Sequence, residues 1–280
     1  MSDRKIEATL DWEQVALSWK KNEKKLLLPR HELNKRMICL TQPIKTHRLL
    51  DFGTGVGEPG LTAAKIAGCE VYGVDVSDTM LKMAEERRNS MGITNFQLFL
   101  LDRPVLPFKN NFFDAVLSSF AIEYSTHLDE DVKELHRVLK PGGLFVISLW
   151  QDCEERNPFQ ALIPKTIREV SYETSLSHDI FFKFSKDDFL EKKMLSLGFT
   201  QINHEIFEGH FSYDSVDEFW NLKKMASPAV MKDMGLLTAR QGLEVQEKIE
   251  KFFVCNKSDS QKEYELPFSA HIYVYKKDFL

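Results

Sequence analysis

The chain of 280 residues has few cysteines and no long hydrophobic run. Its four cysteines are scattered without a Cys-x-x-Cys pair, which excludes the usual spacing of a zinc site and a disulfide framework. The longest strongly apolar stretch, Gly143 to Trp150, is far too short to cross a bilayer. The first ten residues alternate charged and apolar side chains, unlike a signal peptide. These absences favour a cytoplasmic protein with reduced thiols, no metal site and no membrane span.

An excess of positive charge is also missing. The formal net charge is −5, and basic and acidic residues are interspersed along the chain. A protein that neutralises many phosphates usually carries a basic stripe. The densest basic cluster, Lys20 to Lys25, is interrupted by Glu23 and is typical of a solvated helix face. We therefore expect no nucleic-acid partner.

Between Arg48 and Trp150, strand-like segments alternate with helix-like ones. Strands separated by helices predict parallel βαβ units in an open, doubly wound sheet. In such sheets the ligand lies beyond the carboxyl ends of the strands, so the residues directly after each strand are the candidates for chemistry. The expected strands are Arg48–Phe52, Glu70–Asp75, Asn95–Leu101, Phe113–Ser119 and Leu144–Trp150, and the expected helices are Glu58–Ala67, Asp78–Ser90 and Asp129–Leu139.

The flanking segments complete the expected architecture. Residues 1–45 look helical, residues 151–184 look irregular, and residues 212–256 look helical again. The prediction is an α/β fold with a doubly wound, Rossmann-like seven-stranded sheet, a helical N-terminal segment and a helical insertion before the last strand. Residues 1–45 would form a cap, and residues 46–280 one domain with substrate-side insertions at about 151–184 and 212–256. The remaining expected elements are a helix over Asp187–Leu197 and strands over Thr200–Phe207 and Phe268–Lys276.

The strongest chemical signal follows the first strand, where the chain reads Asp-Phe-Gly-Thr-Gly-Val-Gly from Asp51 to Gly57. Glycine is needed where φ is positive or where a ligand approaches bare backbone. The N-terminus of the helix that follows suits a ligand carboxylate. The dinucleotide fingerprint G-x-G-x-x-G, counted from Gly53 and Gly55, requires a third glycine where this chain has Glu58. Counted from Gly55 and Gly57 it finds Gly60, but Asp51 and Gly53 are then unexplained and Pro59 intrudes. A tight turn without any ligand is the other alternative.

The pattern Asp-x-Gly-x-Gly-x-Gly resembles the first motif of the class I S-adenosylmethionine-dependent methyltransferases. The segment Leu135–Gly143, which contains Arg-Val-Leu-Lys-Pro-Gly-Gly, is similar to one in the ubiquinone/menaquinone-type enzymes of that class. Residues Trp12–Trp19 are similar to the N-terminal helix that closes over the cofactor in the same group. The resemblance covers residues 10 to 150 well and the rest loosely. It implies that S-adenosylmethionine is the cofactor.

The position of this motif in the sequence also indicates which other residues should bind the cofactor. Asp75 ends the second strand 18 residues after the last glycine of the motif, where its carboxylate can accept hydrogen bonds from both ribose hydroxyls. A helix-capping role is the alternative, but Ser77 or Asp78 is better placed for it. The resemblance assigns Asp102 to the adenine amino group, although Arg103-Pro104 departs from the family pattern. The predicted cofactor-binding residues are Asp51, Gly53, Thr54, Gly55, Gly57, Asp75, Val76, Met80, Asp102, Arg103, Ser119 and Trp19.

The resemblance implies transfer of a methyl group to a small-molecule acceptor by in-line displacement. Alignment and exclusion of water can supply most of the catalysis. The Asn/Asp-Pro-Pro-Tyr-like motif of nucleic-acid and protein N-methyltransferases is absent after the fourth strand. We hypothesise that Glu123 or His127, which lie there instead, orients or deprotonates the acceptor; solvent-facing loop positions are an equal alternative.

The two insertions contain many aromatic residues and methionines. Trp220, Met225, Met231 and Met234 are suited either to a pocket for a hydrophobic acceptor or to an ordinary core. The alternative function is a binding module that keeps the methyltransferase fold, has lost catalysis and acts through a partner.

Overall fold

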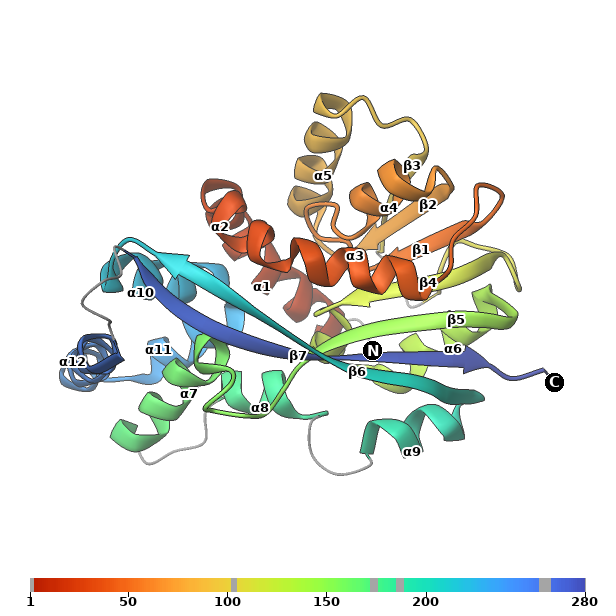
Figure 1. The fold of residues 1–280 in the computed structure, drawn as a ribbon. Coiled ribbons are helices and arrows are strands. Elements are labelled where there is room, and N and C mark those ends of the chain that lie inside the picture. Colours follow the sequence, from red (N-terminus) through yellow and green to blue (C-terminus); the bar gives the residue numbers. More distant parts are fainter. Residues whose placement is uncertain (1–2, 102–104, 172–175, 185–188, 257–262, 280) are drawn as a thin grey trace.

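The structure is a computed structural model that describes residues 3–101, 105–171, 176–184, 189–256 and 263–279. Its centre is a seven-stranded sheet with the strand order β3-β2-β1-β4-β5-β7-β6 (Figure 1). The first five strands pair in parallel, and β7 runs antiparallel to both of its neighbours. The predicted Rossmann-like α/β fold is confirmed. The strands are β1 (Arg48–Phe52), β2 (Glu70–Asp75), β3 (Phe96–Leu100), β4 (Phe113–Ser119), β5 (Leu139–Trp150), β6 (Phe199–Tyr213) and β7 (Tyr264–Lys277).

The segment 151–184 corrects the sequence interpretation, because much of it is helical rather than irregular. Pro158 begins a helix, where its missing N–H leaves no hydrogen bond unmade, and Pro164 lies inside the same helix. The helices are α1 (Asp3–Lys21), α2 (Glu23–Leu27), α3 (His31–Leu40), α4 (Gly60–Ala67), α5 (Asp78–Ser90), α6 (Leu128–Val138), α7 (Pro158–Ser171), α8 (Leu176–Phe182), α9 (Phe189–Ser196), α10 (Val216–Ala226), α11 (Pro228–Leu236) and α12 (Ala239–Asn256), with 3-10 turns η1 (Leu28–Arg30) and η2 (Ile122–Tyr124).

Both faces of the sheet are covered, which explains why its central strands are apolar at consecutive positions. In β1, Leu49 packs with residues of α3 and α4 on one face, and Leu50 packs with residues of α6 and α9 on the other. Each of these two leucines is fully buried. Successive side chains of a strand point to opposite faces, so two hydrophobic clusters form from one run of sequence.

The strand order reverses between β1 and β4, and this point fixes where a ligand can bind. β2 and β3 lie on one side of β1, whereas β4 and β5 lie on the other. The loops that leave the carboxyl ends of β1 and β4 therefore part in opposite directions and leave a crevice between them. All five parallel strands present their carboxyl ends at this same edge of the sheet.

Strands β6 and β7 continue past this edge as a two-stranded ribbon. β5 ends at Trp150, which pairs with Ala270, but β6 and β7 stay paired as far as Tyr213 and Tyr264. Helices α7, α8, α10, α11 and α12 gather around the projecting part of the ribbon (Figure 1). The carboxyl edge of the sheet thus faces a layer of helices from the second half of the chain.

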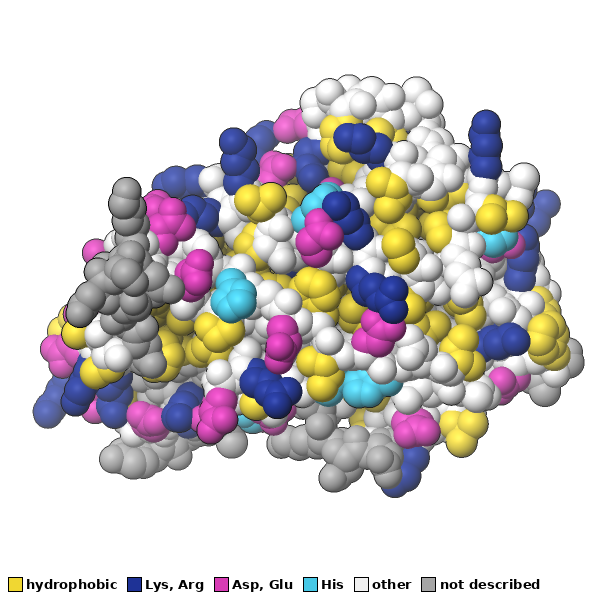
Figure 2. Space-filling model, in the orientation of Figure 1, with side chains coloured by type: hydrophobic (Ala, Val, Ile, Leu, Met, Phe, Trp, Pro, Cys, Tyr) yellow, Lys and Arg dark blue, Asp and Glu magenta, His cyan; other side chains and the backbone are white. Residues whose placement is uncertain are grey.

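The visible surface carries charges of both signs. Figure 2 shows Lys and Arg side chains interspersed with Asp and Glu across one face, with no region of a single sign. Within the described residues, no helix combines the length and the apolar composition needed to cross a membrane.

Candidate active site

The glycine-rich loop after β1 is held in place by the buried carboxylate of Asp51. Its Oδ2 atom accepts hydrogen bonds from the Thr54 hydroxyl (2.6 Å) and from the Gly60 amide (2.8 Å). Burial raises the pKa of Asp51 to about 7, although both hydrogen bonds act to lower it. Asp51 is absent from the residues that line the adjacent cavity. It is therefore placed to hold the loop in shape rather than to touch a ligand, unlike the direct contact predicted from the sequence.

The glycines of the loop serve different purposes. Gly53 has φ +74°, and a Cβ atom there would lie 2.3 Å from the Cβ of Ala121, so only glycine lets the β1 and β4 loops approach this closely. Gly55 has φ +53°, and a Cβ atom there would meet no other atom within 4 Å, so its backbone is open to the cavity. Gly57 instead faces Leu61 of α4 and does not line the cavity.

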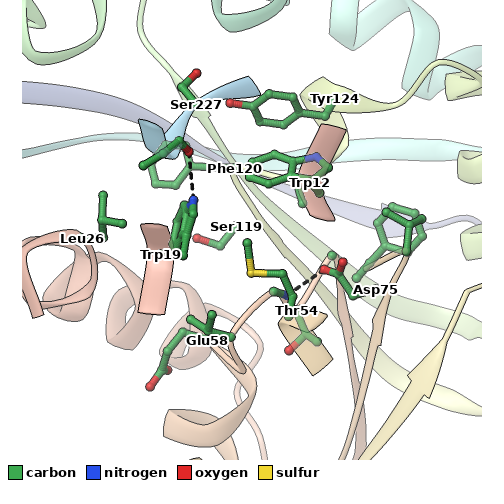
Figure 3. Close-up of a pocket in the computed structure, with 18 of the residues that line it drawn as sticks. Trp12, Trp19, Leu26, Thr54, Glu58, Asp75, Ser119, Phe120, Tyr124 and Ser227 are labelled. Carbon is green, nitrogen blue, oxygen red and sulfur yellow. Dashed lines mark hydrogen bonds between the residues drawn. The ribbon is translucent and has the colours of Figure 1, made fainter. Parts of the chain in front are cut away.

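Asp75 closes the cavity at the end of β2, beside this loop (Figure 3). Its Oδ2 accepts a hydrogen bond from the Gly55 amide (2.7 Å), and its Oδ1 accepts one from the Ser77 amide (3.0 Å). Burial raises the pKa of Asp75, while these backbone amides partly offset the rise. Each carboxylate oxygen can accept a second hydrogen bond. Ser77 caps α5 by accepting from the Met80 amide, as the sequence suggested, and this leaves Asp75 available to a ligand.

Helix α1 lies across the cavity and connects its two ends. Glu13 Oε1 accepts hydrogen bonds from the Ser77 hydroxyl (2.8 Å) and the Thr79 amide (3.1 Å), which docks α1 on the start of α5. At the other side, the Trp19 indole N–H donates to the Ala226 carbonyl oxygen (2.9 Å). Figure 3 shows Trp12 between Asp75 and Tyr124, and Trp19 farther along the cavity beside Leu26 and Ser119. The docking role of Glu13 was not predicted, because one acid in an exposed-looking helix gives no distinct signal.

The loop after β4 forms the opposite wall. Ala121 and Tyr124 line the cavity from η2, where residues three apart lie on the same side of a 3-10 turn. Glu123 is rotated away: it is 1% exposed and does not line the cavity. Burial raises its pKa well above the ordinary value, and the charge of Lys183 partly opposes this rise. His127 does line the cavity. Of the two hypothesised acid–base residues, the structure brings only His127 to the cavity.

Two predicted residues, Asp102 and Arg103, lie outside the described part of the chain. The preceding residue, Leu101, lines the cavity. The predicted cofactor residues that line the cavity are Gly53, Thr54, Gly55, Asp75, Val76, Met80, Ser119 and Trp19.

The cavity extends beyond these residues to an aromatic end under α7 and α10. It has a volume of about 560 Å³, within the range of small-molecule sites. Phe120 stacks on Trp150 at 3.9 Å between ring centroids, and Phe159 stacks on Phe211 at 3.7 Å. These four rings line the cavity. The residues singled out in the insertions, Trp220, Met225, Met231 and Met234, are absent from the lining.

Two cations also line the aromatic end, Arg30 and Lys223. Sequence reasoning missed both. Arg30 belongs to a short basic segment, and Lys223 precedes another lysine in an amphipathic helix, so each is typical of a solvated surface in the sequence alone.

Comparisons with known proteins agree with this geometry. Residues 50–147 match the model of a methyltransferase domain family. The chain is 30% identical over 141 residues to squalene methyltransferase 1 of Botryococcus braunii, covering 50% of this chain and 37% of that protein. It is 33% identical over 146 residues to the ubiquinone/menaquinone biosynthesis C-methyltransferase UbiE of Pseudomonas putida, covering 51% and 55%. Residues 50–147 therefore carry a methyltransferase domain.

A solved structure resembles the fold of the chain beyond the matched domain. A Bacillus halodurans protein, assigned as a methyltransferase, superposes with a TM-score of 0.59 at 18% identity, covering 88% of this chain and 98% of that one. By contrast, the chain spans only about a third to two thirds of the length of the curated relatives it matches.

The cofactor of this family is S-adenosylmethionine. The residues present fit it, because the Asp75 carboxylate, with free acceptor capacity, and the bare backbone of Gly55 meet at one end of a cavity large enough for more than a cofactor fragment.

Proposed function

We propose that this methyltransferase transfers a methyl group from S-adenosylmethionine to a small molecule whose apolar body binds at the aromatic end of the cavity. The observation that carries the proposal is the continuity of one cavity from Asp75 and Gly55 to the stacked rings of Phe120 and Phe159. A methyl donor and an acceptor bound in the same cavity can meet directly. The names of the relatives, squalene methyltransferase and a quinone C-methyltransferase, support an apolar acceptor.

The sulfonium of the cofactor supplies an activated methyl group, so the protein mainly has to align the reactants and exclude water. Asp75 would hold the ribose hydroxyls, and the Gly55 backbone would allow close approach of the cofactor. Trp12 and Trp19 would cover the point where cofactor and acceptor meet. Residues 1–45, which include both tryptophans, would thus act as the predicted cap.

His127 is the residue we propose for handling a proton of the acceptor. Its side chain lines the cavity next to Tyr124 and Ser125, on the loop that follows β4. Replacing His127 by Gln keeps a polar side chain of similar size and removes the titratable ring. Loss of kcat with an unchanged KM for the cofactor would support this role, and unchanged turnover would exclude it.

Calorimetric titration of S-adenosylmethionine tests the proposed function. Binding to the wild type and at least tenfold weaker binding to Asp75→Ala are expected, since the ribose would lose two charge-assisted hydrogen bonds. Asp78→Ala is the matched control, because Asp78 is exposed and pairs with Lys82 rather than lining the cavity. Absence of binding to the wild type would refute the proposal. Binding without methyl transfer to any apolar acceptor would favour the inactive binding module instead.

A further inference from the structure

We propose that the acceptor carries an anionic group, a carboxylate or a phosphate, which binds to Lys223 and Arg30 at the aromatic end of the cavity. This inference rests on the proposed function, because it concerns the acceptor half of the same cavity.

Lys223 is a buried cation with no anionic partner among the described residues. Its side chain is 4% exposed and lines the cavity. The ammonium donates a hydrogen bond to Gln160 Oε1 (2.6 Å) and lies 4.1 Å from the ring centroid of Phe159 and 5.6 Å from that of Phe181. An ammonium has three N–H donors, so neutral groups leave most of its capacity to bind an anion unused.

Arg30 adds a second positive charge to the same end. Its Nε donates to the Leu26 carbonyl oxygen (2.8 Å), and its guanidinium carbon lies 5.1 Å from the Trp19 ring and 5.9 Å from the Phe120 ring. One terminal nitrogen, Nη2, has no hydrogen-bond partner within the described residues. Burial lowers the pKa of Arg30 only to about 10, so it stays charged near neutral pH. A planar guanidinium with a free N–H edge suits carboxylate or phosphate oxygens.

The carboxylates around the cavity do not neutralise these two cations. Glu58 pairs with Arg87 at 3.1 Å, and Asp131 accepts a hydrogen bond from the Ser125 hydroxyl. Asp75 accepts two backbone amides at the cofactor end, and Glu130 is exposed. The charges of Glu58 and Glu123 reach Arg30, but neither forms an ion pair with it.

The free-energy cost of burying these two cations without an anion is reflected in the pKa of Lys223. Burial, and then the charge of Arg30, lower the pKa of Lys223 to about 7. A buried cation is stabilised when an anion binds beside it, so a bound anion should raise this pKa and the neutral amine of Lys223 should take up a proton to become the ammonium. A purely apolar acceptor would neither need these cations nor repay their desolvation.

Three naphthalene probes of the same shape test the inference in protein saturated with S-adenosylhomocysteine: naphthalene-2-carboxylate, 2-naphthyl phosphate and 2-naphthalenemethanol. We expect at least one of the two anions to bind about tenfold or more tightly than the alcohol, and the better anion distinguishes carboxylate from phosphate. At pH 8, titrations in Hepes and Tris should show proton uptake with the anion and none with the alcohol. These wild-type measurements need no variant.

Lys223→Met should remove the preference for the anion and the proton uptake, whereas Lys224→Met, its neighbour outside the cavity lining, should keep both. Equal binding of anions and alcohol, or a preference retained in Lys223→Met, would overturn the inference alone. Lys223→Met could instead lose affinity for S-adenosylhomocysteine and keep it for methylthioadenosine, which lacks the amino-acid carboxylate. This result would also overturn the inference, because Lys223 would then bind the carboxylate of the cofactor. Failure of the wild type to bind S-adenosylhomocysteine would instead refute the proposed function.

Discussion

Replacing Lys223 by Met should stabilise the ligand-free protein, and by an amount that depends on pH. The ordinary pKa of a lysine in the unfolded chain is 10.5, and that of Lys223 in the folded protein is lowered to about 7. At about 1.4 kcal/mol for each pH unit, keeping this ammonium charged in the folded state costs roughly 5 kcal/mol of the free energy of unfolding. Because Lys223 is almost fully buried, solvent screening reduces this figure little.

The sign of this pH dependence follows from the number of protons that the folded and unfolded states bind. Between pH 7 and 10.5 the unfolded chain binds one more proton than the folded protein, so this group makes stability rise with pH across that window. The cost is present in full below pH 7 and is gone above 10.5. Lys223→Met, which has no such cost, loses the hydrogen bond to Gln160, about 1 kcal/mol, and the contacts of the ammonium with the Phe159 and Phe181 rings.

Urea unfolding of the wild type, Lys223→Met and Lys224→Met at pH 6, 7.5 and 9 measures the effect. The advantage of Lys223→Met over the wild type should shrink by roughly 2–3 kcal/mol from pH 6 to pH 9. Lys224→Met is the control for the loss of one lysine from α10, and its difference from the wild type should not depend on pH in this range. An advantage of Lys223→Met that is the same at all three pH values would refute the reasoning.

Three further substitutions test the cofactor end. Gly53→Ala places a methyl group 2.3 Å from Ala121 Cβ at a positive φ, which costs about 1–3 kcal/mol; we expect a lower Tm and weaker cofactor binding by calorimetry, and unchanged affinity would contradict this. Asp51→Asn keeps an oxygen for the loop but removes a carboxyl whose pKa is raised from 3.8 to about 7. The wild type should therefore lose stability as the pH rises between these values, and the variant should not; urea unfolding across this pH range measures the difference. Trp19→Phe removes the hydrogen bond to the Ala226 carbonyl and should cost about 1 kcal/mol in the same assay; equal stability would show that this contact does not hold α1 in place.

The cofactor half of this protein was predictable because its signals are local. The run from Asp51 to Gly57 places an acid, a strand end and a helix start within a few residues, and β2 repeats the pattern at Asp75. Even there, the sequence could not separate the residues that contact a ligand from those that support the loop. Asp51 and Gly57 lie in the motif but face the interior, since which side of a turn a residue occupies depends on the helix packed beneath it.

The aromatic end of the cavity was not predictable, because its residues meet only through long-range packing. Lys223 and Gln160 are 63 positions apart and touch only because α7 and α10 both pack on the β6–β7 ribbon. Pro164 suggested a break where a helix continues. Glu123 was selected as an acid in the expected place, but its orientation is set by the 3-10 turn η2, which the sequence pattern does not specify.

The ribbon formed by the outer parts of β6 and β7 adds a second set of walls to the cavity from outside the matched domain. The matched methyltransferase domain ends at residue 147, before the ribbon and its helices begin. Substitutions in α7 or α10 can therefore reshape the aromatic end of the cavity and leave the loops that follow β1 and β2 in place.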